Sequence, residues 1–154
     1  MTESGFSADE RAAMKHRAEE LRSTKGLKGA AKLVKELESC MDAIEALEGT
    51  DKAVATLLHR VVSEEAPELM PKTWYGFPSY AKDGKLIVYY QPASKFKTPY
   101  GTIGFSENAA LDDGDMWPNA YAVIAASDGV EQRLRGLVRR AASDAASISP
   151  PNTL

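Results

Sequence analysis

The sequence changes character at Lys72, and this change constrains the fold more than any other feature. Before Lys72, apolar residues recur at helical spacing, most clearly at Val54, Leu57, Leu58, Val61 and Val62. That spacing predicts a helix that lies against a core, and it ends before Pro67. After Lys72, β-branched and aromatic residues between frequent Gly and Pro predict short strands joined by tight turns.

Three further helices are expected around these strands. Ser7 to Glu10 form a capping box for a helix that ends near Ser23, and its poor apolar stripe predicts a loosely packed appendage. The closing helix begins at Asp128 and buries one apolar face. A helix that ends at Gly49 is predicted to bury the face that carries Leu27, Ala30, Val34, Leu37, Met41 and Ile44.

The strands follow in a row. Asp83-Gly84 is a hairpin signal, so we expect strands near 75–81 and at 85–91. A third strand is expected over about 96–105, where Gly101 and Gly104 indicate a bulge or the close approach of another backbone, and a fourth over 120–125. Helices segregated from a meandering antiparallel sheet predict an α+β fold with the sheet covered on one face.

Length and composition suit one soluble domain. The chain has 154 residues, its apolar runs are too short to span a membrane, and its first residues lack a secretory signal. We therefore expect a cytoplasmic protein that does not enter the membrane. The single Cys40 has neither a His nor a second Cys beside it, which predicts a packed helix residue.

The net charge of −3 conceals unlike blocks. Residues 72–100 carry 5 basic and 1 acidic side chains, whereas residues 101–131 carry 0 and 6. A functional surface would thus show two faces of opposite sign, and the basic part of one subunit could meet the acidic part of another in a weak homo-oligomer. The acidic total disfavours nucleic acid.

Several short motifs in this region resemble one family, the YdhG-like domains, a bacterial group largely of unknown function. They are Trp74-Tyr75-Gly76-Phe77-Pro78-Ser79-Tyr80, Asp83-Gly84-Lys85, Lys95-Phe96-Lys97, Gly104-Phe105 and Leu111-Asp112-Asp113-Gly114-Asp115-Met116-Trp117-Pro118. The resemblance covers about residues 38–142, which leaves 1–37 as an N-terminal helical extension and 143–154 as a disordered tail. It implies a small cytosolic α+β domain with four to five antiparallel strands between N-terminal helices and a C-terminal helix.

One branch of that family is described as a frataxin-like iron chaperone, so the resemblance implies iron binding and delivery. Hard cations need clustered oxygen ligands, and two groups of carboxylates are candidates. One is a helix ridge, Glu38, Asp42 and Glu45, and the other is the loop that carries Glu107, Asp112, Asp113 and Asp115. A solvated helix face and an ordinary Asp-Gly turn explain the same residues.

A binding module for a small molecule, a protein or single-stranded nucleic acid is the alternative. Planar groups would stack on aromatic side chains while lysines meet anions. The candidate lining is Trp74, Tyr75, Phe77, Tyr80, Lys95, Lys97 and Trp117, although plain sheet packing accounts for these residues too. For catalysis only His59 is a plausible base, and no nucleophile lies at a telling spacing. The pattern therefore favours a non-catalytic protein with no certain cofactor.

Overall fold

The computed structural model describes residues 6–143, which form an α+β fold. Its strands make one antiparallel sheet in the order β1-β2-β3-β4-β5, as the sequence predicted. The elements in chain order are α1 (Ala8–Thr24), α2 (Gly29–Glu45), α3 (Gly49–Glu65), β1 (Met70–Trp74), β2 (Phe77–Lys82), β3 (Lys85–Gln91), α4 (Ala93–Phe96), β4 (Gly101–Phe105), β5 (Ala120–Val123) and α5 (Asp128–Ala141).

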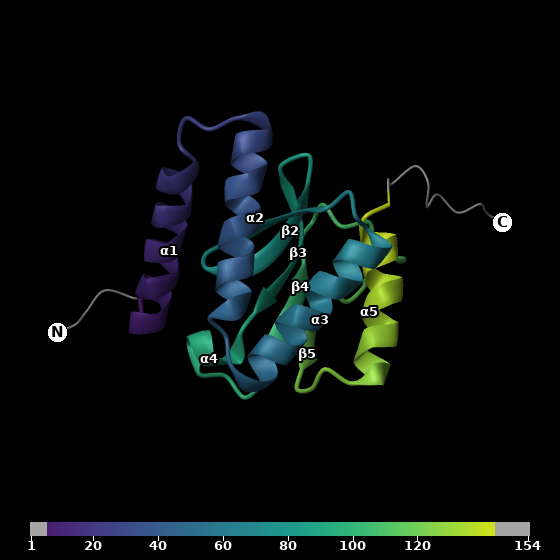
Figure 1. Ribbon diagram of the computed structural model, residues 1–154. Helices are drawn as coiled ribbons and strands as arrows, with labels where there is room; N and C mark the ends of the chain where they lie inside the picture. The colour runs from purple at the N-terminus through teal and green to yellow at the C-terminus, as the bar shows by residue number, and fades with distance from the viewer. Residues whose placement is uncertain (1–5, 144–154) are drawn as a thin grey trace.

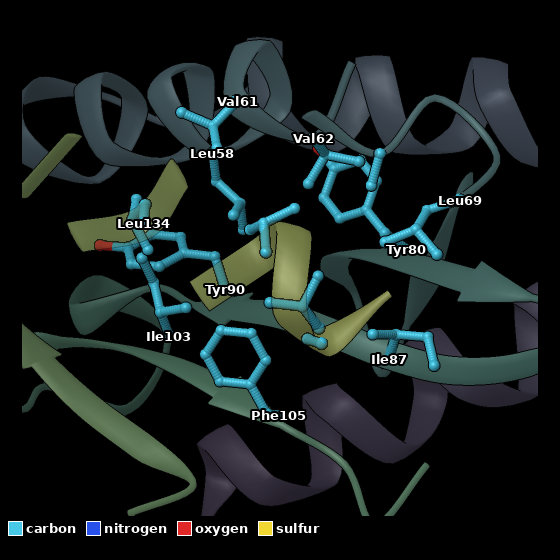
Figure 2. Close-up of a cluster of buried hydrophobic side chains, with 14 of the residues drawn as sticks. Leu58, Val61, Val62, Leu69, Tyr80, Ile87, Tyr90, Ile103, Phe105 and Leu134 are labelled. Atoms are coloured by element: carbon cyan, nitrogen blue, oxygen red, sulfur yellow. The ribbon is translucent and has the colours of Figure 1, made fainter. Parts of the chain in front are cut away.

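Helices α2, α3 and α5 lie over one face of the sheet, and α1 stands beside α2 on the side away from α5 (Figure 1). The core fills the space between α3, α5 and the strands (Figure 2). The predicted apolar stripe of α3 is confirmed, because all five of its residues are buried. They meet Tyr80, Tyr90, Ile103 and Phe105 of the sheet, and each fully buried Leu or Val contributes about 1.5–3 kcal/mol.

The prediction for the buried face of α2 is wrong except at Ile44. Val34, Leu37 and Met41 are 55%, 41% and 38% exposed, and the buried residues of α2 are Cys40 and Ile44. The helix turns this side inward because it packs on β1 and β2, where Glu36 also pairs with Lys72 at 3.7 Å. A charged residue thus belongs to the inward side, which an apolar pattern does not reveal. The helix ends at Glu45, and Gly49 already begins α3.

Strand β1 and helix α4 are absent from the sequence prediction. The strand expected from residue 75 begins at Phe77, because Tyr75 and Gly76 form a tight turn with φ of 55° and 83°. A tyrosine at positive φ is uncommon, so the turn gave no signal. Residues 93–96 are helical, and the third strand is shorter than expected. The Asp83-Gly84 hairpin is confirmed, with φ of 52° and 80°.

Two glycines of β4 are required by aromatic rings. A Cβ on Gly104 would lie 2.3 Å from the ring of Tyr89, and a Cβ on Gly101 would lie 2.1 Å from the hydroxyl of Tyr90. The two glycines are therefore closely approached, as predicted, but by the side chains of Tyr89 and Tyr90 and not by another backbone. The two tyrosines are consecutive in β3 and lie on opposite faces of the sheet, because successive strand residues alternate.

The boundary expected between residues 37 and 38 falls inside α2, which continues unbroken across it. The expected extension therefore contains α1 and the first half of α2. Of the expected tail, residues 144–154 lie outside the described part of the chain. Among the helices of residues 6–143, none combines the length and the apolar character needed to cross a bilayer.

Candidate functional site

A cleft of about 950 Å³ opens between α1 and α2. The β1–β2 turn, α4 and the junction of α2 with α3 complete its walls. The residues that line it are His16, Glu19, Glu20, Ser23, Lys35, Ser39, Asp42, Ala43, Ala46, Leu47, Glu48, Gly49, Thr73, Gly76, Ser94 and Lys95. Four separate segments of the chain thus surround one space, as is common for binding sites of small molecules.

Polar contacts hold α1 in place as one wall of the cleft. The Glu20 carboxylate accepts hydrogen bonds from the backbone N–H of Tyr75 at 3.1 Å and of Gly76 at 2.7 Å. At the same turn, a Cβ on Gly76 would lie 3.1 Å from the ring of His16. No residue of α1 is buried, so these contacts replace the apolar packing that other helices have. The sequence prediction of a poorly packed helix is confirmed.

Four charged side chains border the cleft without a partner. Lys35 and Asp42 come from α2, Glu48 from the start of α3, and Lys95 from α4. Within residues 6–143, none of the four side chains takes part in a hydrogen bond or an ion pair. By contrast, Glu45 on α2 is bonded to Lys52 at 3.1 Å. The cleft thus offers two free cations and two free carboxylates to a ligand.

A smaller cavity of about 160 Å³ lies between α1 and α4. It shares His16, Ser94 and Lys95 with the cleft. Its other lining residues are mainly apolar: Asp9, Ala12, Ala13, Tyr75, Phe77 and Phe96. The rings of Phe77 and Phe96 lie 5.8 Å apart, which fixes one aromatic wall. The two spaces together present a charged region beside an apolar one, and we call this side cavity the aromatic cavity.

The predicted ligand-binding residues divide between several places. Tyr75, Phe77 and Lys95 do line the aromatic cavity. Trp74 does not line it, but the centroid of its ring lies 4.9 Å from that of Tyr75. Lys97 is exposed and bonds Asp9 of α1 at 3.3 Å. Trp117 is 37% exposed and does not line the cleft or the aromatic cavity. The expected set is therefore only partly one site.

Tyr80 has to be removed from that set. Its side chain is fully buried on the helix-covered face, where its hydroxyl lies 3.0 Å from Nδ1 of His59 and 3.9 Å from Sγ of Cys40. His59, the base that the sequence left open for catalysis, is half-buried and its ring nitrogen is occupied by this tyrosine. Burial raises the pKa of Cys40 to about 11, so this thiol is not a nucleophile at neutral pH.

The predicted metal ligands do not form a cluster. Asp42 faces the cleft, Glu38 is exposed, and Glu45 is bonded to Lys52. Glu107, Asp112, Asp113 and Asp115 are exposed in their loop. Across residues 6–143, no three His, Cys, Asp or Glu side chains gather as a metal ion would require. Iron binding by these carboxylates stays a prediction, which anaerobic titration with ferrous iron tests.

Several lining residues were missed from the sequence, among them His16, Lys35, Ser39 and Ser94. His16 and Lys35 fall in the segment assigned to an extension, so they were not weighed as part of a site. Tertiary contacts bring α1 to this place: Glu20 bonds the Tyr75-Gly76 turn, and Asp9 bonds Lys97 beyond α4. No spacing in the sequence carries that information.

Comparison with known proteins gives no relative: no family model, no curated protein and no solved structure matches this chain. The resemblance to YdhG-like domains therefore stays a prediction, and the site has to be interpreted from its own geometry.

Proposed function

We propose that the protein binds a small zwitterionic ligand with an apolar group, such as a free amino acid or a short peptide, in the cleft between α1 and α2. One observation supports this function above the others. Unpaired charges of both signs border a space that shares His16, Ser94 and Lys95 with the neighbouring aromatic cavity. A ligand that carries a carboxylate, an ammonium group and an apolar side chain matches all three features.

Each part of such a ligand has a partner in the cleft. Its carboxylate meets Lys35 or Lys95, and its ammonium group meets Asp42 or Glu48. Hydrogen bonds between charged groups are roughly twice as strong as neutral ones, so they orient the ligand. The apolar group enters the aromatic cavity beside Phe77 and Phe96. Because the cleft is wide and its charges are exposed to water, we expect modest affinity and a binding role without chemistry.

Calorimetric titration with phenylalanine, leucine and glycine tests the proposal. Phenylalanine and leucine are expected to bind, and glycine to bind at least about tenfold more weakly because it lacks the apolar group. N-acetyl-leucine lacks the ammonium group and leucinamide lacks the carboxylate, so each is expected to bind more weakly than leucine by a similar factor. These derivatives separate the role of the charges from that of the aromatic cavity.

Matched variants locate the site. Lys35→Gln with Lys95→Gln, and Asp42→Asn with Glu48→Gln, should each weaken binding about tenfold or more, since each double variant removes both partners of one sign. Lys85→Gln is the control, because Lys85 is exposed at the start of β3 and lines neither space. The proposal is refuted if no zwitterion binds saturably, or if both cleft variants bind as the control does.

A further inference from the structure

The sheet has an open edge at β5. Within residues 6–143 this strand pairs with β4 alone. At the opposite edge, α2 packs on β1. In the β4–β5 register Ile103 lies opposite Tyr121, and the N–H of Phe105 donates to the carbonyl of Asn119 at 2.8 Å. Ladder bonds alternate along an antiparallel strand. Asn119, Tyr121 and Val123 thus bond towards β4, and the backbone groups that point outward belong to Ala120, Ala122 and Ile124.

This edge lacks the protection that edge strands usually have. Natural proteins place Lys, a bulge or a covering element there, because unpaired backbone groups attract another strand. Here no charged residue occurs from Met116 to Ser127. Ala120 and Ala122 are exposed, and Ile124 is 76% exposed. The guanidinium of Arg133 on α5 lies over the Tyr121 ring, 5.4 Å from its centre.

We propose that β5 pairs with β5 of a second copy of this chain, antiparallel and about a twofold axis at Ala122. In this register Ala122 meets its own symmetry mate, and Ala120 meets Ile124 of the other copy. Every outward backbone group then has a partner, because each such pair exchanges two hydrogen bonds. An isologous contact of this kind closes on itself and makes a dimer.

The side chains on this edge fit a second copy of the same strand. The large Ile124 lies opposite the small Ala120, and Ala122 lies opposite Ala122, so no two large groups collide on that face. On the other face, Tyr121 lies opposite Val123, a pairing of an aromatic with a β-branched residue that stabilises strands. The paired segments bring no like charges together, because residues 116–127 carry none. The same segment is thus complementary to itself in shape and in charge.

The surface area that a single strand pair buries is smaller than the area buried in a stable complex. The dimer should therefore form only at high protein concentration. Salt should have little effect on the strand pairing itself, since screening acts on charges and residues 116–127 carry none. These two properties distinguish it from a dimer in which basic and acidic surfaces attract each other, which high salt would separate.

Light scattering across protein concentrations, at low and high salt, gives the first test. The wild type should approach twice the chain mass of 16.7 kDa as concentration rises to about 1 mM. Ala122→Pro removes an outward N–H that β4 does not use, so the monomer should keep its fold and the dimer should weaken about thirtyfold. Ile124→Lys places like charges at the edge and should act similarly. Thr56→Lys, on the exposed side of α3, is the control and should dimerise normally.

Hydrogen exchange at single residues gives the second test. On raising the concentration, amide exchange should slow at Ala120, Ala122 and Ile124 and stay unchanged at Tyr121 and Val123, which already bond to β4. The proposal is overturned if the wild type stays monomeric at about 1 mM, or if Ala122→Pro and Ile124→Lys still dimerise. Protection of this edge only after a different protein is added would assign it to that partner and would equally overturn the dimer.

Discussion

Asp51 connects the start of α3 to the end of β3 and to α4, and its replacement tests how this part of the fold is held. Its carboxylate accepts hydrogen bonds from the Tyr90 hydroxyl at 2.6 Å and from the backbone N–H of Ala93 and Ser94 at 2.8 and 3.0 Å. Burial alone would raise the pKa of Asp51, but these hydrogen bonds outweigh it and hold the pKa below its usual value. The folded protein therefore favours the charged carboxylate.

Asp51→Ala leaves the buried Tyr90 hydroxyl without its acceptor. A buried polar group without a partner costs about 1–3 kcal/mol, whereas water can reach the N–H of Ser94, which is exposed. We therefore expect Asp51→Ala to lower the free energy of unfolding by about 3 kcal/mol. Tyr90→Phe removes one bond and should cost about 1–2 kcal/mol. The double variant should lose less than the sum by about 1 kcal/mol, since both remove the same bond.

Urea unfolding of the four proteins measures these differences, and its pH dependence adds a second criterion. Because the pKa of Asp51 is lower in the folded state, its stabilisation is complete above the unfolded pKa of about 3.9 and is lost as pH falls through the folded pKa. The difference in free energy of unfolding between wild type and Asp51→Ala should thus become smaller in acid. Additive losses, or a gap that does not change with pH, would refute the reasoning.

Three further predictions follow from contacts described above. Gly104→Ala should lower the free energy of unfolding by about 1–3 kcal/mol, because the added Cβ meets the ring of Tyr89. In a Tyr89→Ala background, which removes this ring, the loss should be smaller. An equal loss in both backgrounds would contradict the contact. Glu20→Gln should speed amide exchange in α1 at least about tenfold while the melting temperature stays constant. The control Glu19→Gln should leave this exchange rate unchanged. If the amides of α1 stay protected in Glu20→Gln, another contact holds the helix. Burial lowers the pKa of His59, so the unfolded chain binds the proton more readily and stability should fall from about pH 7.5 to about pH 5.5. The melting temperature measured across this pH range should vary less in His59→Gln. An unchanged pH dependence would show that other groups cause it.

Local chemistry was sufficient to predict much of the fold. The stripe of α3 and the Asp83-Gly84 hairpin are properties of a few neighbouring residues, and both were correct. The errors occur where the partner is distant in sequence. The buried side of α2 is decided by β1, including the pair Glu36 and Lys72, and the Tyr75-Gly76 turn is stabilised in part by Glu20.

The candidate site was harder to predict than the fold. Of the residues that the motifs singled out, Tyr75, Phe77 and Lys95 line the aromatic cavity. Tyr80 is buried in the core instead, because its direction depends on strand alternation after a turn that was not predicted. Lys35 and Asp42 are ordinary surface charges on a helix until α1 stands beside them. A site assembled from helices that are far from the sheet in sequence leaves no local pattern.

The strictly sequential strand order also has a consequence for folding kinetics. Each strand pairs with the next one along the chain, so the sheet grows by closing short loops, which favours rapid assembly. The contact of α5 with α3 is different, because it joins Arg135 to Glu65, which are 70 residues apart in the chain. We expect substitutions at this contact to accelerate unfolding and to leave the folding rate nearly unchanged, so that α5 is the last element to dock.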